Sequence, residues 1–200
     1  MRRPACLLLA AAALLAGCGG EGGGDEDEIT AMIEASARTT GPAACTLYYT
    51  QDLLEQSTKL RGEAAVSACE EDLRDEPSPS DAVVVSQLEV DGEEGSADVA
   101  YRGGPFDGQT VRYALAHRDG AWKLDQMVAF PVFDRKAMLR ESARAAYDRS
   151  HTPAELDATA CGVERLRELS DAALQELLLS RSPQPLLDIA KACEPSSASA

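Results

Sequence analysis

The chain has 200 residues, of which 34 are acidic and 19 are basic, so that its formal net charge at pH 7 is −15. So acidic a chain is not expected to bind nucleic acid, because phosphate contacts need a basic face. The same charge argues against a folded part that lies flat on an anionic lipid surface. The length allows one domain of ordinary size, or one domain with an appendage.

Residues 1–17 have the pattern of an export signal. Arg2 and Arg3 make a short basic start, and an apolar run over 6–16 follows. The run is too short to cross a hydrocarbon core, which needs roughly 20 apolar residues. It ends in Leu-Ala-Gly-Cys at 15–18. This segment resembles the lipobox of bacterial lipoproteins, which implies cleavage before Cys18 and a diacylglycerol on its sulfur. An ordinary secretory signal with a cysteine there by chance is the alternative.

The lipobox resemblance implies a protein that is lipid-anchored to the cell membrane on its extracytoplasmic face. Two or more acyl chains give stable anchoring, whereas one chain gives only marginal binding. Beyond Cys18, the glycine-rich stretch 18–25 is expected to be a flexible linker. Removal of residues 1–17 takes away two arginines and no acid, so the mature chain carries a net charge of about −17.

The cysteines predict two disulfides, because an exported chain lies where disulfides persist. With Cys6 in the signal and Cys18 lipidated, four of the six cysteines remain, and four allow three pairings. We expect the pairs that each lie within one segment of the chain: Cys45–Cys69 and Cys161–Cys193. Metal ligation is not expected, because CxxC spacing and histidines at zinc spacing are both lacking.

Residues 26–133 are expected to form one α+β domain that begins with three helices. Apolar residues recur at helical spacing from Ile29 to Ala37, after an acidic first turn that suits the helix dipole. The other two helices are expected from Thr50, as an N-cap, to about Arg61 and from about Glu63 to Arg74.

Cys45 limits where the second helix begins. A helix without a break from Cys45 to Leu60, at about 1.5 Å per residue, would hold Cys45 too far from Cys69. We therefore expect the helix to begin near Thr50 and the residues around Cys45 to be extended. The alternative is that the cysteines pair differently.

Four strand-like runs follow, separated by Asp-Gly turn signals. They cover 82–90, 96–102, 109–118 and 121–130. On the third run Val111, Tyr113 and Leu115 share one face. On the fourth run the expected inner residues are Trp122, Leu124, Gln126, Val128 and Phe130. The pattern predicts an antiparallel meander with one face free to receive helices.

Three helices followed by a meander that ends in His-Arg-Asp-Gly-Ala-Trp-Lys-Leu at 117–124 resemble the nuclear transport factor 2-like superfamily. The resemblance covers roughly 26–130 and extends to exported bacterial members with one cysteine before the second helix and one in the third, as Cys45 and Cys69 stand here. It implies a cone-like α+β fold, in which a sheet curls around helices and often encloses a pocket. The chain departs from the pattern because no short hairpin is evident between its second and third helices.

Residues 134–194 are expected to form an all-α C-terminal module, and 195–200 a disordered end. Asp134 is expected to cap a helix that runs to about Arg149, and Thr152 and Glu155 form a capping box that begins the next one. Ser170 is expected to cap a third helix, and a last helix is expected at 186–193. The stretch between Cys161 and Cys193 resembles a small cysteine-stapled helical module of exported bacterial proteins. Such a module is either an appendage or a lid docked over the open end of the cone.

Little in the chain indicates catalysis. The motifs Gly-x-Ser-x-Gly, Ser-x-x-Lys and His-Glu-x-x-His are absent. Of the two histidines, only His117 continues the strand face of Tyr113, and Asp125 is expected to point away from the inner face. The aromatic and polar residues otherwise available to a pocket are Tyr48, Tyr49 and Tyr101. We take Tyr113, His117 and Trp122 as the candidate pocket residues.

The expected function is that of a membrane-tethered, non-enzymatic module of the cell envelope that binds a ligand or another envelope protein, or acts as an accessory. No cofactor is expected. The alternative is a small-molecule isomerase or hydrolase-like enzyme that uses a pocket with Tyr113 and His117, because catalysis needs a base within reach of the reacting group.

Overall fold

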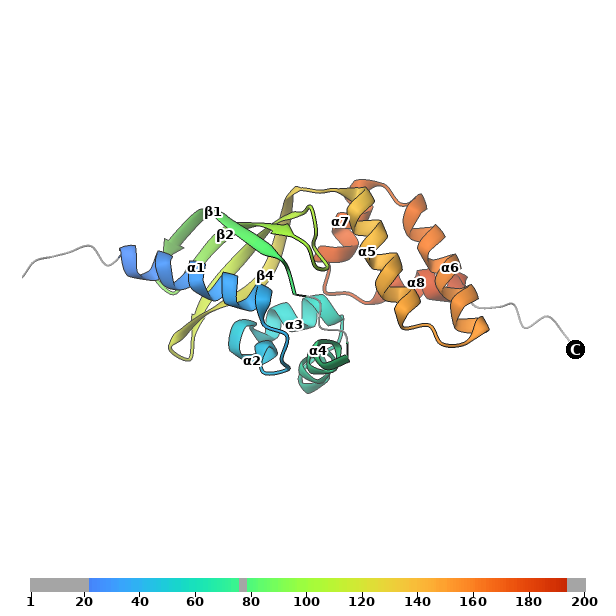
Figure 1. Ribbon diagram of the computed structural model, residues 1–200, viewed down its shortest axis with the longest axis horizontal. Coiled ribbons are helices and arrows are strands. Elements are labelled where there is room, and N and C mark those ends of the chain that lie inside the picture. Colours follow the sequence, from blue (N-terminus) through green and yellow to red (C-terminus); the bar gives the residue numbers. More distant parts are fainter. Residues whose placement is uncertain (1–21, 76–78, 194–200) are drawn as a thin grey trace, which may run out of the picture.

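The computed structural model describes residues 22–75 and 79–193 (Figure 1). The expected signal, the lipidation of Cys18 and the chain end at 195–200 lie outside these residues. The described chain has an α+β fold: helices flank one four-stranded antiparallel sheet, and four further helices follow it. Within this part of the chain no helix is both long and apolar enough to cross a membrane.

Four helices, rather than the three expected, precede the sheet. They are α1 (Gly22–Arg38), α2 (Ala44–Tyr48), α3 (Gln51–Thr58) and α4 (Glu63–Asp75). Helix α1 begins earlier than expected, so that residues 22–25 of the expected linker are already helical, with Asp25 in the first turn. Ile29 and Ile33 lie on its inner face and are completely buried.

The extra helix is α2, which contains Cys45, and the expectation of an extended chain there was wrong. The break before α3 was predicted correctly: Tyr49 is extended, and the Thr50 side chain caps α3 by accepting from the backbone N–H of Leu53. Because the chain bends at Tyr49, a helical Cys45 still reaches Cys69, at a Cα–Cα distance of 6.1 Å. A short helix followed by a bend thus brings Cys45 close enough to Cys69 for the disulfide, as an extended segment would.

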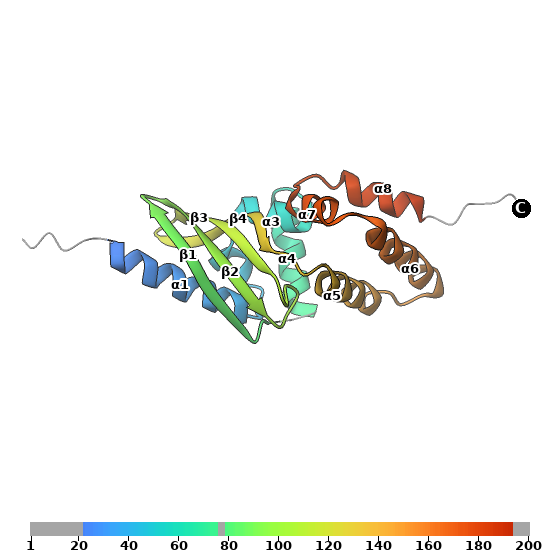
Figure 2. The same ribbon diagram turned by 90° about the horizontal axis from the view of Figure 1, so that it is seen from above.

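The sheet is the predicted meander, with strand order β1-β2-β3-β4. Its strands are β1 (Ala82–Asp91), β2 (Glu94–Arg102), β3 (Thr110–Arg118) and β4 (Ala121–Val132). Each pairs antiparallel with the next, and Asp119 and Gly120 both have positive φ in the last turn, as a tight hairpin requires. Figure 2 shows α1 running along one face of this sheet.

The inner face of β4 differs from the prediction after Leu124. The pairing of β4 with β3 has three register shifts, and two of them leave Asp125 and Val128 without a partner, which marks a bulge at each. Each bulge adds a residue and shifts the alternation of side chains. Gln126 and Val128 therefore leave the inner face, and Val128 is exposed. The buried residues of β4 are Trp122, Leu124, Met127 and Phe130.

The C-terminal helices are α5 (Arg135–Asp148), α6 (Pro153–Glu168), α7 (Asp171–Leu179) and α8 (Gln184–Ala192). The expected caps at Asp134, Thr152 and Ser170 are all formed, and Glu155 completes the capping box. Both expected disulfides are formed, Cys45–Cys69 and Cys161–Cys193. In both views these helices lie at the end of the molecule away from the start of α1 (Figures 1 and 2).

The C-terminal helices are joined to the α+β part by two buried glutamines. The Gln56 amide donates to the carbonyls of Met127 (2.8 Å) and Leu179 (2.6 Å), and its oxygen accepts from the Met127 N–H (2.7 Å). The Gln109 amide pairs in the same way with both backbone groups of Asp134, each at 2.9 Å. Gln56 thus fixes the end of α7 against β4, and Gln109 fixes the start of α5.

Lys59 adds a third link between the two parts. It follows α3 in the left-handed conformation, and its ammonium donates to the carbonyls of Gln56 (2.7 Å), Leu178 (3.0 Å) and Ser180. These carbonyls belong to the C-terminal ends of α3 and α7, where the helix dipoles favour a cation. The α7 region is therefore part of the packed structure and not a free appendage.

Candidate functional site

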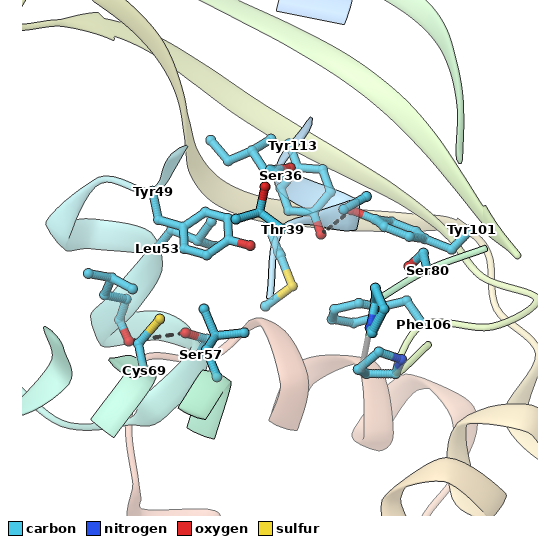
Figure 3. Close-up of a pocket in the computed structure, with 17 residues that line it drawn as sticks. Ser36, Thr39, Tyr49, Leu53, Ser57, Cys69, Ser80, Tyr101, Phe106 and Tyr113 are labelled. Atoms are coloured by element: carbon cyan, nitrogen blue, oxygen red, sulfur yellow. Dashed lines mark hydrogen bonds between the residues drawn. The ribbon is translucent and has the colours of Figure 1, made fainter. Parts of the chain in front are cut away.

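A cavity of about 220 Å³ lies between the inner face of the sheet and helices α1, α3 and α4 (Figure 3). The C-terminal part of α1 and the Cys69 side of the Cys45–Cys69 disulfide form part of its wall. Leu53, Phe106 and Met127 are among its apolar lining residues. The part of the lining that the structure describes contains no Asp, Glu, Lys, Arg or His. The site is therefore an uncharged one.

Three tyrosines from different elements meet in this cavity. Tyr49 comes from the bend between α2 and α3, Tyr101 from β2 and Tyr113 from β3. The Tyr101 hydroxyl donates to the Tyr113 hydroxyl at 3.0 Å. Figure 3 shows the hydroxyl of Tyr49 directed towards the same part of the cavity. The polar groups of the site thus gather at one place in an otherwise apolar lining.

All three tyrosines are held in the neutral form. Burial raises the pKa of Tyr113 and of Tyr101 well above the usual 10.0, because the phenolate would lose its hydration. Burial also raises the pKa of Tyr49, and the nearby Tyr48 adds to this effect. At neutral pH the cavity therefore presents phenol O–H groups and no charge.

The other hydroxyls of the α1 and α3 walls are already used. Ser36 donates to the carbonyl of Ile33 at 2.8 Å, and Thr39 donates to that of Ala35 at 2.7 Å. Ser57 donates to its own helix in the same way, at 3.2 Å from the Leu54 carbonyl. These three groups line the cavity but have no proton left to offer a ligand.

The structure separates the three candidate pocket residues. Tyr113 lines the cavity, whereas His117 and Trp122 are not among its lining residues. They pack edge to face, with ring centroids 5.4 Å apart, next to the turn that joins β3 and β4, and Trp122 belongs to the core. His117 shares the strand face of Tyr113 but lies four residues closer to that turn. Alternation along a strand predicts the face of a residue and not its position along the cavity.

Tyr49 and Tyr101 are the site residues that were not chosen from the sequence. Tyr101 alternates with Val99 and Ala97 on β2, a pattern that could have placed it on the inner face. Tyr49 had no such signal, because its position depends on a bend and on a bridge to Leu124. Asp125 lines a second, more polar hollow near the β3–β4 turn, which shares Tyr49 and Leu54 with the cavity.

The groove at α5 and the acidic groups of the described chain indicate no second site. A groove at α5 is lined by basic side chains, but Arg135, Arg140 and Arg167 form ion pairs there with Asp171, Asp107 and Glu164. Residues 22–75 and 79–193 contain no group of three His, Cys, Asp or Glu side chains that could hold a metal.

Comparisons with family models, with curated protein sequences and with solved structures gave no match to this chain. A function can therefore be proposed only from the sequence and from the geometry of the cavity.

Proposed function

We propose that the protein is an exported lipoprotein, anchored through Cys18 at the extracytoplasmic face of the cell membrane, whose α+β domain is a non-enzymatic ligand-binding module. The anchor rests on the basic start, the apolar run and the lipobox-like residues 15–18. Since α1 begins at Gly22, the chain between Cys18 and the helix can span at most about 14 Å. The domain would then stand close to the bilayer.

The order of elements supports the proposed relation to the nuclear transport factor 2-like superfamily. Helices pack on one face of a four-stranded antiparallel meander, and a cavity lies between the two layers. This is the arrangement that a cone-like fold would have. The four further helices then form a module that is docked through α7 rather than loosely attached.

The uncharged cavity is the observation that carries the binding function. Its volume of about 220 Å³ exceeds the roughly 150 Å³ of an apolar cavity that is large enough to take up benzene. An isomerase or hydrolase-like activity would need a general base with a pKa near the working pH. The only titratable groups of the described lining are phenols, and because burial raises their pKa they stay protonated at neutral pH and cannot take up a proton as a general base would. These features favour binding over catalysis.

Changing Cys18 to alanine is expected to move the protein from the membrane fraction to the soluble fraction of the exporting cell. The reason is that Cys18 would carry the only acyl chains expected of the mature chain. The matched control is Cys6→Ala, which changes a cysteine inside the proposed signal and should leave the protein in the membrane fraction. Membrane retention of the Cys18→Ala protein would contradict the proposed anchor.

The cavity is expected to bind indane, an uncharged bicyclic hydrocarbon. In the full chain with Cys18→Ala, titration followed by amide NMR should shift the signals of cavity residues such as Tyr49 and Tyr113. Filling the cavity by Ala37→Phe, at a lining position, should weaken this binding at least tenfold. Shifts that are absent, or that persist unchanged in Ala37→Phe, would contradict the binding function.

A further inference from the structure

We propose that the ligand of this cavity is an uncharged molecule of bicyclic size with a carbonyl oxygen that accepts hydrogen bonds from the hydroxyls of Tyr49 and Tyr113. This inference rests on the proposed binding function and specifies the class of ligand. Three properties of the cavity lead to this inference: the lack of charged side chains in its lining, the hydroxyl protons that have no acceptor, and its volume.

The absence of charge in the lining excludes ionised ligands. A carboxylate or ammonium group that enters an apolar cavity loses its hydration at a cost of several kcal/mol. This cost is offset only by a counter-charge or by a set of hydrogen bonds to the ion. Among residues 22–75 and 79–193, no ionisable side chain other than the three tyrosines lines the cavity, and burial keeps these neutral. The ligand is therefore uncharged.

The hydrogen bonds within the cavity leave protons without an acceptor. Tyr101 and Tyr113 carry two hydroxyl protons, and the bond between them uses one. The proton of Tyr113 and that of Tyr49 have no acceptor among the described residues. Figure 3 shows both hydroxyls facing the same space, whereas Ser80 lies apart, beside Tyr101 and Phe106. The cavity thus offers two donors at one place.

A carbonyl oxygen matches this pair of donors. It has two lone pairs and no proton, so it can accept from Tyr49 and from Tyr113 at once. Phenol O–H groups in an apolar surrounding gain most from an acceptor that enters with the ligand, because a donor left unpaired there pays its full desolvation cost. A hydrocarbon of the same shape would leave both donors unpaired.

The volume sets the size of the ligand. If about 150 Å³ takes up the six carbons of benzene, then 220 Å³ takes up roughly nine or ten non-hydrogen atoms. This corresponds to two fused rings with one carbonyl group and is too small for a long acyl chain. Apolar walls that include Leu53, Leu124 and Met127 suit the ring carbons.

Three probes of similar size test the ligand class: 1-indanone, indane and 1-aminoindane, which is an ammonium ion at neutral pH, each titrated against the full chain with Cys18→Ala by NMR. 1-Indanone is expected to bind about tenfold more tightly than indane, since each hydrogen bond contributes about three- to tenfold and the ketone must first lose water. The ammonium ion of 1-aminoindane is expected not to bind. Binding of indane with no gain for 1-indanone would overturn the carbonyl assignment and leave the binding function standing. Failure of indane itself would overturn the binding function.

Variants that each remove one hydroxyl test which tyrosines donate to the carbonyl oxygen of the ligand. Tyr49→Phe and Tyr113→Phe should each weaken the binding of 1-indanone about three- to tenfold. Tyr113→Phe also frees the proton that Tyr101 donates to Tyr113, so the variant that combines both changes with Tyr101→Phe is the one that should bind 1-indanone no better than indane. Unchanged binding of indane in every variant shows that the cavity remains intact. The control is Tyr147→Phe, because Tyr147 lies on α5, is 41 % exposed and is not among the lining residues, so the loss of its hydroxyl should leave both affinities unchanged. An equal loss of 1-indanone affinity in Tyr147→Phe would contradict the role of Tyr49 and Tyr113.

Discussion

Replacing Gln56 with leucine is expected to lower the free energy of unfolding by about 4 kcal/mol. The Gln56 side chain is completely buried and holds both backbone groups of Met127 and the carbonyl of Leu179. Leucine has a similar volume but no polar atoms, so three backbone groups would lose their partner: the two of Met127 where they are buried, and the Leu179 carbonyl where it is partly buried. Each such group costs about 1–3 kcal/mol when it remains buried. Urea denaturation of the Cys18→Ala chain measures the change.

The control for this prediction lies on the same helix. Gln51 also makes two side-chain hydrogen bonds, to Glu55 and to the carbonyl of Gly62, but it is exposed. Water can replace both bonds, so Gln51→Leu should change the free energy of unfolding by no more than about 0.5 kcal/mol. If the two variants lose equal stability, the burial of the Gln56 amide is not what holds α7 to the α+β part.

Helix α3 shows why Gln56 could not be recognised from the sequence. The spacing of its apolar residues predicts an inner stripe that includes Leu60, yet Leu60 is 46 % exposed and Gln56 is 0 % exposed. The helix ends at Thr58, because Lys59 turns into the left-handed conformation, and Leu60 lies beyond it. One partner of Gln56 is the carbonyl of Leu179, far along the chain. A buried polar residue whose partners are this distant leaves no local pattern.

Local signals, in contrast, predicted most of the elements. The caps at Asp134, Thr152 and Ser170 depend on residues within one turn of the helix that they begin, and all three are formed. The strands were predicted because their turn residues and alternation lie within each hairpin. The bulges at Asp125 and Val128 were not, since they appear only in the pairing of β4 with β3.

In the candidate site, too, local patterns predicted some features, and contacts between distant parts of the chain decide the others. Tyr113 could be chosen because alternation on β3 places it on the inner face, and it lines the cavity. His117 satisfies the same rule but is not among the lining residues, because the cavity occupies only part of that face. The partner that matters for Tyr113 is Tyr101, which comes from the neighbouring strand. Only the register of β2 and β3 brings the two hydroxyls together.

Removing the Cys45–Cys69 disulfide is expected to cost about 3–4 kcal/mol of global stability. In the double variant Cys45→Ala, Cys69→Ala, the chain loses a link that spans 24 residues and joins α2 to α4. Cys45 is completely buried in a small cluster with Leu54 and Ala65, so the cost of looser packing adds to the entropic loss. The free energy of unfolding, measured by urea denaturation, should fall, and indane binding should weaken because Cys69 lines the cavity.

The second disulfide is the matched control. It shows whether the loss of global stability comes from loop entropy or from packing around Cys45. Cys161–Cys193 spans 32 residues, so a model based only on loop entropy predicts a loss of similar size for Cys161→Ala, Cys193→Ala. Helix α8, however, has no buried residue, and exposed Leu187 shows how little of it is packed. Without its disulfide α8 should open by itself, so amide exchange speeds up in α8 while global stability falls by less than about 1 kcal/mol. Equal global losses from the two double variants would show that loop closure, and not packing around Cys45, sets the stability of this fold.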